Sequence, residues 1–435
     1  MKITIHRGTK EIGGSAVELE SGESRIVKDI GMPLTFNDRK FEFSEFSHLE
    51  GKELVKQKIL PDIKGLYYWD DCHKPVDGVL ISHAHQDHYG FFGYLKRDIP
   101  VYLGEATRKL MDATVMFTPL EGEINTPHYI QHEKSFTCGQ FHITPYLMDH
   151  AAFDAYAFVV EAEGKKIIYT GDFRAHGRKK KIFDWFLHKA PREVDAILLE
   201  GTMLGRSGEH IMDEEELEEE AVKVMENTSG QVLIYTSSQN IDRLVSFYKA
   251  SKRTGRTFVV DLYTAIILDI VRNYGKLPYP SHDYDKLSVF YPWKLCQKLT
   301  SEKQKELMYK FTKHKIIKEE ISSGGNNISM LVRPSFMKDL SLIDNLSGAS
   351  LIYSMWEGYL EEEINKKFLE FLESKEVKDI HYLHTSGHAS FSDLKLLVDT
   401  LHPQSIIPIH TDTPEAYQTL GGNICYLKDG EGFTI

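Results

Sequence analysis

The chain has 435 residues, of which 41% are hydrophobic, 27% charged and 11% aromatic, a composition that excludes a disordered or low-complexity protein. Its formal net charge of −12 argues against broad, nonspecific attraction to nucleic acid, although a local basic surface stays compatible with it. A signal-peptide pattern and an apolar run of about 18 residues are both absent from the sequence, so no membrane segment is expected.

The chain begins with an alternating pattern that predicts three strands, in residues 2–8, 15–21 and 24–31, with a turn at Gly13 and Gly14. Later apolar runs alternate with helical patterns. Helices are predicted over 213–227, over 240–255 and over 390–403, where Ser390 and Asp393 form a capping pair. Strands that alternate with helices predict an α/β protein, and the length favours two domains.

Several polar residues follow apolar runs, where a strand is expected to give way to a loop. They are His83, His150, Asp172, Glu200, His388 and His410. In layered α/β folds, functional sites form at the carboxyl ends of the strands. We therefore expect these residues, which are distant in the sequence, to meet at one edge of a sheet.

The segment "HAHQDH" contributes four candidate metal ligands in six positions: His83, His85, Asp87 and His88. A single histidine is usually a surface or core residue, but a cluster this dense indicates metal binding. The spacing does not let all four side chains reach one ion at about 2.1 Å. It suits two ions, with His83 and His85 on one and Asp87 and His88 on the other.

Each ion needs further ligands, and His150, Asp172 and His410 are candidates because each follows an apolar run. The two oxygens of Asp172 could bridge the ions. Imidazole and carboxylate ligands favour zinc, with manganese or iron as alternatives. Two such ions about 3.5–4 Å apart are typical of metal-assisted hydrolysis.

Asp29 in "KDIGMP", the "HAHQDH" segment, His150 and Asp172 in "YTGDF" together resemble the successive motifs of the metallo-β-lactamase superfamily. The resemblance implies an αββα sandwich with a dimetal centre. It also implies that Asp29 orients a ligand histidine. Lys28 departs from the pattern, because this strand is usually more apolar.

About 200 residues separate Asp172 from "HTSGHAS" and "IPIHTD", a layout that resembles the β-CASP nuclease branch, in which a second α/β domain is inserted. On this resemblance the metallo-β-lactamase domain is expected over 1–203 and, as a C-terminal return, over 366–435. The inserted α/β β-CASP domain is expected over 204–365. Glu200, His388 and His410 match the three acidic or histidine motifs of that branch.

With a histidine at position 410, the last motif resembles that of the RNA-processing members of the branch. Nearly the whole chain resembles ribonuclease J-like nucleases. The C-terminal extension of ribonuclease J is expected to be absent after Ile435. The resemblance implies a dimetal phosphodiesterase, a hydrolase that acts as a 5′-exonuclease or endonuclease on single-stranded RNA.

In the mechanism implied by this resemblance, His83, His85 and His150 hold one ion, Asp87, His88 and His410 hold the other, and Asp172 bridges them. A metal-bridging hydroxide would attack phosphorus. His388 would donate a proton to the leaving oxygen or bind the phosphate, with Glu200 holding it in orientation. The ions are expected to be Zn²⁺, with Mn²⁺ as the alternative.

Substrate contacts are harder to predict. Ser386 and Gly387 could cradle a phosphate, although they could equally form a turn before the capped helix. His384 could contact substrate or lie in the core. Five arginines could contact the RNA backbone, with surface ion pairs as the competing interpretation: Arg174, Arg178, Arg243, Arg253 and Arg256.

Three alternatives stay open: a metallohydrolase of a small phosphodiester, a DNA nuclease, and a scaffold protein with an inactive site. The first fits the acidic net charge, and the last fits poorly because every expected ligand is present. The four cysteines are scattered without a C-x-x-C pair, which predicts a cytoplasmic location. The expected partners are RNA or DNA and a second copy of the chain, as a homodimer, with no membrane.

Overall fold

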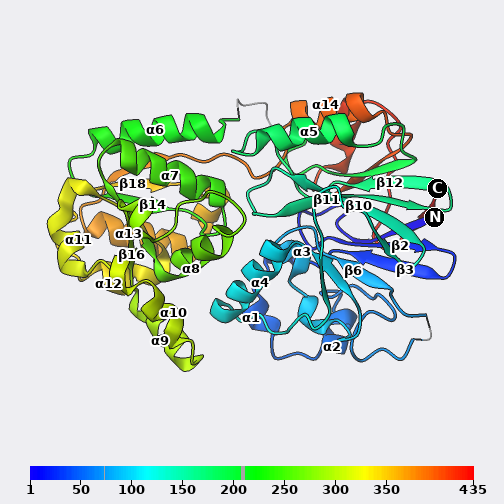
Figure 1. Cartoon of the computed structure of the whole chain (residues 1–435), viewed down its shortest axis with the longest axis horizontal. Coiled ribbons are helices and arrows are strands. Elements are labelled where there is room, and N and C mark those ends of the chain that lie inside the picture. Colours follow the sequence, from blue (N-terminus) through cyan, green and yellow to red (C-terminus); the bar gives the residue numbers. More distant parts are fainter. Residues whose placement is uncertain (73, 207–210) are drawn as a thin grey trace. The chain divides into compact units, whose positions relative to one another are not determined.

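The computed structural model describes residues 1–72, 74–206 and 211–435. By packing, these residues divide into two compact units, shown in Figure 1. Unit 1 contains residues 1–210 and 387–435, and unit 2 contains residues 211–386. Among the described helices, none is both long and apolar enough to cross a bilayer.

The described part of unit 1 contains a seven-stranded and a six-stranded sheet. The first, in spatial order, comprises β21 (Gly432–Thr434), β1 (Lys2–Arg7), β2 (Ala16–Ser21), β3 (Ser24–Lys28), β6 (Gly78–Leu80), β7 (Val101–Leu103) and β8 (Pro127–Tyr129). The second comprises β20 (Ile406–Ile409), β13 (Ala196–Glu200), β12 (Lys165–Tyr169), β11 (Ala155–Ala162), β10 (Phe141–Met148) and β9 (Phe136–Cys138). The three predicted N-terminal strands are confirmed as β1, β2 and β3.

The two sheets of unit 1 pack face to face. Their facing side chains, among them Ile3, Leu19, Phe158 and Ile167, form one apolar core. A second core lies on the outer face of the six-stranded sheet, under helices α5 (Lys180–Lys189) and α14 (Phe391–Leu401) (Figure 1). The remaining helices of this unit are α1 (Phe43–Phe46), α2 (Gly51–Lys56), α3 (Gln86–Tyr89) and α4 (Glu105–Phe117). This layering confirms the expected αββα sandwich.

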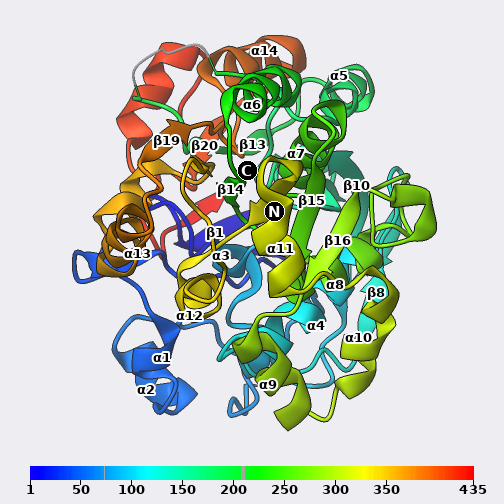
Figure 2. The same ribbon diagram turned by 90° about the vertical axis from the view of Figure 1, so that its left-hand side faces the viewer.

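Unit 2 is a parallel α/β layer. Its described sheet has the order β16 (Leu287–Phe290), β15 (Thr257–Asp261), β17 (Ile328–Leu331), β14 (Val232–Tyr235), β18 (Ser350–Tyr353) and β19 (Asp379–Tyr382). Figure 2 shows its described α-helices, which are α6 (Glu214–Asn227), α7 (Ile241–Arg253), α8 (Leu262–Val271), α9 (Trp293–Ser301), α10 (Lys305–Lys310), α11 (Lys318–Gly324), α12 (Met337–Leu340) and α13 (Glu363–Ser374). Such an arrangement is typical of an inserted α/β domain.

The boundaries between the units differ from those expected. The sequence placed the return to the first domain at residue 366, whereas the structure places it at 387. Helix α13 packs its Phe368 and Leu372 into the core of unit 2, and β19 pairs in parallel with β18. The first boundary also lies later, at 210/211 rather than 203/204.

Candidate active site

The predicted site residues lie at the carboxyl ends of strands in unit 1. Asp29 follows β3, His83 and His85 follow β6, and Asp87 and His88 lie on α3 directly afterwards. His150, Asp172 and His410 follow β10, β12 and β20, Glu200 ends β13, and His388 precedes α14. These residues do come together, but at the carboxyl ends of strands from both sheets of unit 1 rather than at one edge of a single sheet.

Three of the histidines form one group. A ring nitrogen from each of His83, His85 and His150 lies within 4.8 Å of the other two. Nε2 of His150 is 3.2 Å from Nδ1 of His85. Their rings meet edge to face, with centroids 4.7–4.9 Å apart. This group matches the first predicted ligand set.

A second group contains Asp87, His88, Asp172 and His410, whose ligand atoms also lie within 4.8 Å of one another. Nε2 of His88 is 3.1 Å from Oδ2 of Asp172, and Nε2 of His410 is 3.2 Å from Oδ2 of Asp87. Oδ2 of Asp172 is also 3.8 Å from Nε2 of His83, so the two groups adjoin at Asp172. This position is the one expected of a bridging carboxylate.

Asp29 holds His88 in orientation. Its Oδ2 lies 2.8 Å from Nδ1 of His88 and accepts a hydrogen bond of 2.7 Å from the Tyr169 hydroxyl. The backbone N–H and hydroxyl of Ser82 donate to the same carboxylate, at 2.7 and 2.8 Å. Asp29 has a left-handed φ of 56°, an uncommon conformation that its hydrogen bonds support. These contacts direct Nε2 of His88 toward Asp172.

Two further orienting contacts were not predicted from the sequence. Nδ1 of His150 lies 2.6 Å from the carbonyl oxygen of Gly387, and Nδ1 of His410 lies 2.8 Å from the hydroxyl of Thr202. Each contact fixes a ring through one nitrogen and leaves Nε2 directed into the site. Thr202 follows Glu200 by two residues, so the motif "EGT" could have indicated a second residue that orients a ligand.

Glu200 and His388 are neighbours, but Glu200 acts mainly on the backbone beside that histidine. Oε1 of Glu200 accepts a hydrogen bond of 3.1 Å from the N–H of Ala389, while Nδ1 of His388 lies 3.5 Å away. Oε2 accepts from the N–H of Thr202 at 3.0 Å. Nδ1 of His388 also lies 3.7 Å from Oδ2 of Asp172, which places this imidazole against the ligand groups.

Burial and neighbouring charges set the ionisation of these groups in opposite directions. Burial lowers the pKa of His85 to about 4, and burial with the surrounding imidazoles holds the pKa of His83 and His150 well below the usual range. Burial raises the pKa of Asp87, but the hydrogen bond from His410 and the charge of His88 bring it down to about 2. Neutral imidazoles and ionised carboxylates are the forms that bind metal.

The donor set fits divalent cations. Nε2 of His83 and Oδ1 of Asp172 are buried, and among the described residues neither atom has a hydrogen-bond partner. Unpaired buried polar atoms are costly unless something binds them. Imidazole nitrogens and carboxylate oxygens in two adjoining groups are suited to zinc, manganese or iron.

The predicted substrate contacts are partly revised. The carbonyl of Gly387 accepts from His150 and so has a ligand-orienting role, whereas Ser386 and His384 belong to unit 2 and stay predictions. Three of the arginines proposed as RNA contacts are buried: Arg174, Arg243 and Arg256. That interpretation is wrong for them, because their guanidinium groups contact Asp149, Glu214 and backbone carbonyls respectively.

Two family models match the chain. Residues 68–236 match the beta-lactamase superfamily domain, and residues 375–419 match the Zn-dependent metallo-hydrolase RNA specificity domain. The first match includes the "HAHQDH" segment, His150, Asp172 and Glu200. The second includes His388 and His410.

Curated relatives align along most of the chain at low identity. Ribonuclease J 2 of Streptococcus pyogenes is 23% identical over 99% of this chain and 75% of its own length. A ribonuclease J of Helicobacter pylori is 23% identical over 94% of this chain, which spans only 56% of that relative. A ribonuclease J of Mycoplasma genitalium is 22% identical, with coverage of 94% and 67%.

A crystal structure of a protein of unknown function from Enterococcus faecalis has the same fold. It superposes with a TM-score of 0.80 at 21% identity and covers 100% of this chain and 99% of its own. Residues 68–236 therefore match a metallo-β-lactamase superfamily domain, and the chain is similar to ribonuclease J proteins along most of its length.

Proposed function

We propose that the chain is a metal-dependent ribonuclease that hydrolyses phosphodiester bonds in single-stranded RNA with two divalent metal ions, Zn²⁺ in preference to Mn²⁺. The observation that carries this proposal is the pair of adjoining ligand groups that meet at Asp172. The match of residues 375–419 to an RNA specificity domain supports RNA over DNA. The names of the curated relatives support the same substrate.

In this proposal His83, His85 and His150 hold one ion, and Asp87, His88 and His410 hold the other, with Asp172 between them. Two bound ions would polarise the phosphodiester and lower the pKa of water at the site. The protein's part is to favour neutral imidazoles at His83, His85 and His150 and ionised carboxylates at Asp87 and Asp172, as the directions of their pKa shifts indicate. Asp29, Thr202 and the carbonyl of Gly387 keep the ligand rings in orientation.

His388 is the proposed proton donor to the leaving oxygen. Burial lowers its pKa, but the carboxylates of Glu200 and Asp172 outweigh that effect, so the pKa of His388 is raised above its usual value. A raised pKa favours the protonated imidazole, the form a general acid requires. Glu200 positions it through the N–H of Ala389.

The test is a cleavage assay with the zinc- or manganese-loaded protein. Single-stranded RNA, labelled at the 5′ end or internally, is compared with DNA of the same sequence. We expect RNA to be cut, with product sizes that separate 5′-exonuclease from endonuclease activity. An Asp87→Ala, His88→Ala variant should be inactive, and a His388→Ala variant should keep both ions but lose at least 100-fold in rate.

Three results would change the proposal. Cleavage of DNA alone would make the protein a DNA nuclease. Hydrolysis of bis(p-nitrophenyl) phosphate without any cleavage of RNA or DNA would favour a small phosphodiester as substrate, as the acidic net charge does. Full activity of His388→Ala would remove that residue from the mechanism. Light scattering of the same preparation tests the expected homodimer.

A cytoplasmic location is part of the proposal. The four cysteines are free thiols in the structure, and Cys138 is buried against the core between the sheets. Unpaired thiols suit a reducing compartment.

A further inference from the structure

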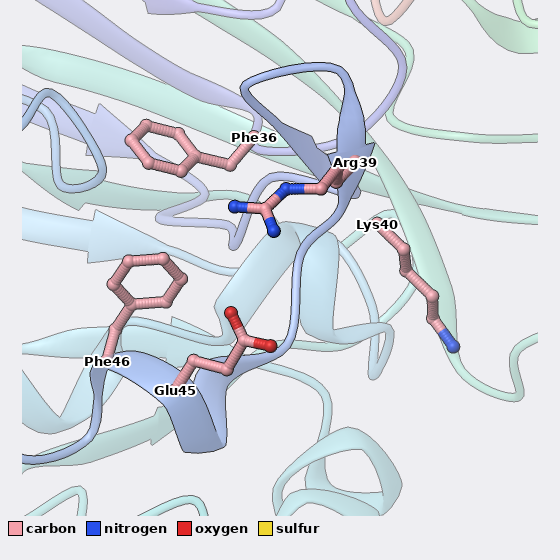
Figure 3. A pocket seen from close by; sticks show the side chains of 5 residues that line it. All are labelled: Phe36, Arg39, Lys40, Glu45 and Phe46. Carbon is pink, nitrogen blue, oxygen red and sulfur yellow. The ribbon is translucent and has the colours of Figure 1, made fainter.

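A small hairpin leads from the metal-binding region to a pocket that the proposed mechanism does not use. Strands β4 (Thr35–Phe36) and β5 (Arg39–Lys40) pair in antiparallel, and helix α1 follows. The two turn residues, Asn37 and Asp38, have left-handed φ values of 51° and 60°, as a tight hairpin turn requires. The pocket is lined by the residues labelled in Figure 3, namely Phe36, Arg39, Lys40, Glu45 and Phe46, and is called the hairpin pocket below.

Backbone hydrogen bonds fix the segment before the hairpin beside the metal-binding loop. The N–H of Ile30 donates to the carbonyl of His88 at 2.8 Å, and the N–H of Met32 donates to that of Gln86 at 3.0 Å. Phe91, just after α3, donates its N–H back to Ile30 at 3.0 Å. Residues 30–32 therefore run alongside the loop that carries Asp87 and His88.

The base of the hairpin is anchored at the same place. The N–H of Phe41 donates to the carbonyl of Leu34 at 2.8 Å, and the Phe41 ring packs against Phe91 with centroids 6.5 Å apart. A Cβ atom built on Gly13 would lie 2.7 Å from Cγ of Leu34 and 3.0 Å from Cβ of Asp87. Leu34 and Asp87 thus both lie beside Gly13, and the hairpin begins next to the metal-binding region.

The hairpin pocket combines aromatic rings with positive charge. Phe36 and Phe46 meet edge to face with centroids 5.6 Å apart, and both rings are partly exposed. Arg39 pairs with Phe36 across the hairpin, and its guanidinium points into the space between the two rings (Figure 3). Lys40 points away from that space. Exposed rings beside a guanidinium suit a nucleobase and its phosphate.

The positive charge that faces the hairpin pocket comes from one side chain, in a chain whose formal net charge is −12. Arg39 is the cation that faces the hairpin pocket and supplies the local attraction that a phosphate needs, whereas Lys40 is ion-paired with Glu42 at 3.1 Å. Glu45, the remaining lining residue, is an acceptor that suits a ribose hydroxyl or a base amino group rather than a phosphate. A protein partner would not require rings, a cation and an acceptor together. Each nucleotide of a single strand has a base, a phosphate and a ribose that match them.

We propose that the hairpin pocket binds one nucleotide of the single-stranded substrate close to the nucleotide that is cut, with the base against Phe36 and Phe46 and the phosphate at Arg39. This inference rests on the proposed ribonuclease function and adds a specificity-determining subsite to it. The subsite would favour strands that extend past the scissile bond over minimal substrates.

The test compares two double variants of the full-length, metal-loaded protein. Phe36→Ala, Arg39→Ala removes a ring and the charge from the hairpin pocket. Trp293→Ala, Lys294→Ala is the matched control in unit 2, because Trp293 is exposed and is followed by an exposed lysine. The readout is kcat/KM for a short single-stranded RNA divided by that for bis(p-nitrophenyl) phosphate. Fluorescence anisotropy of the same RNA measures binding separately.

We expect the ratio of the two kcat/KM values to fall at least ten-fold in the pocket variant and to stay at the wild-type value in the control. RNA affinity should fall by a similar factor and depend less on salt. An unchanged ratio and affinity in the pocket variant, with RNA cut by the wild type, overturns the subsite alone. A wild type that binds RNA without cutting it overturns the ribonuclease function, while a ten-fold loss of binding in the variant would still support the subsite. The single Arg39→Ala variant repeats the test if the double variant melts early.

Discussion

Lys28 lies in the core between the two sheets of unit 1, where its side chain is fully buried. Its Nζ atom is 4.4 Å from the centroid of Phe158 and 5.2 Å from that of Tyr169. Among the described residues Nζ has no hydrogen-bond partner. Burial lowers the pKa of Lys28 to about 7, against the opposing effect of Asp29. The charged form is therefore held only by the two rings and a neighbouring carboxylate.

The pH dependence of stability follows from this lowered pKa. In the unfolded chain the lysine titrates near pH 10.4, so between about pH 7 and 10.4 the unfolded state binds more protons. The free energy of unfolding should therefore rise with pH across that range, by up to about 1.4 kcal/mol per pH unit. Below pH 7 the lysine is charged in both states, so the folded state bears the full cost of burying the charged ammonium group.

We predict that Lys28→Met stabilises unit 1 by roughly 1–4 kcal/mol at pH 6.5, because a methionine fills the space without a buried charge. The gain should shrink as pH approaches 9.5, where the wild-type lysine is neutral. Thermal unfolding of both proteins from pH 6 to 9.5 measures it. A melting-temperature difference that stays constant over this range would contradict the assignment.

Among the elements of unit 2, the C-terminal end of α6 is tied to two strands by one arginine. The guanidinium of Arg256 is buried and donates to the carbonyls of Met225, Thr228, Gly230 and Ile328, at 2.7–3.1 Å. These carbonyls lie at the end of α6 and just before or at the start of β14 and β17. A fork of planar donors satisfies them all at once, which an ammonium group cannot do.

We predict that Arg256→Lys lowers the free energy of unfolding by about 2–3 kcal/mol, because buried carbonyls lose their donors. Arg253→Lys is the control, since Arg253 is exposed and pairs with Glu218 and Glu219 at the surface. It should change stability by less than about 0.5 kcal/mol. Urea denaturation followed by circular dichroism gives the values, with hydrogen exchange assigning the transition to unit 2. Equal effects of the two substitutions would show that the buried fork is not the stabilising feature.

The sequence predicted most of the site because strand ends and metal-ligand spacing are local features. The positions of His83, Asp172 and His410 at the ends of strands follow from the sequence alone, because each comes directly after an apolar run. The sequence did not separate buried from exposed arginines, because Arg256 and Arg253 occur in the same basic run and differ only in what folds against them. The predicted boundary at 366 differs from the division by packing at 387, because an apolar run does not show which sheet β19 joins.

At the scale of the whole molecule, all seven predicted metal ligands belong to unit 1, although His410 lies more than 200 residues after Asp172. Within unit 1, residues at the end of β13 and just after it are bonded to the C-terminal part of the chain. Glu200 bonds to the N–H of Ala389 at 3.1 Å, and Thr202 bonds to His410 at 2.8 Å. Unit 1 therefore has the contacts needed to form its ligand groups from its own residues.

We predict that a chain in which residues 211–386 are replaced by a short Gly-Ser linker still folds and binds two metal ions. Elemental analysis after dialysis gives the stoichiometry, and circular dichroism checks the fold. The full-length protein and its Asp87→Ala, His88→Ala variant are the references. A folded deletion protein that holds fewer than two ions would mean that unit 2 contributes to metal binding.

The last strands of the chain complete both sheets of unit 1, since β20 pairs with β13 and β21 pairs with β1. During synthesis the six-stranded sheet therefore lacks β20 until residue 409 has been made, and the seven-stranded sheet lacks β21 until residue 434 has been made. His388 and His410 also emerge late, so a prematurely terminated fragment lacks a complete ligand set. For a protein proposed to cut RNA, this order of synthesis would keep unfinished chains from degrading the message that encodes them.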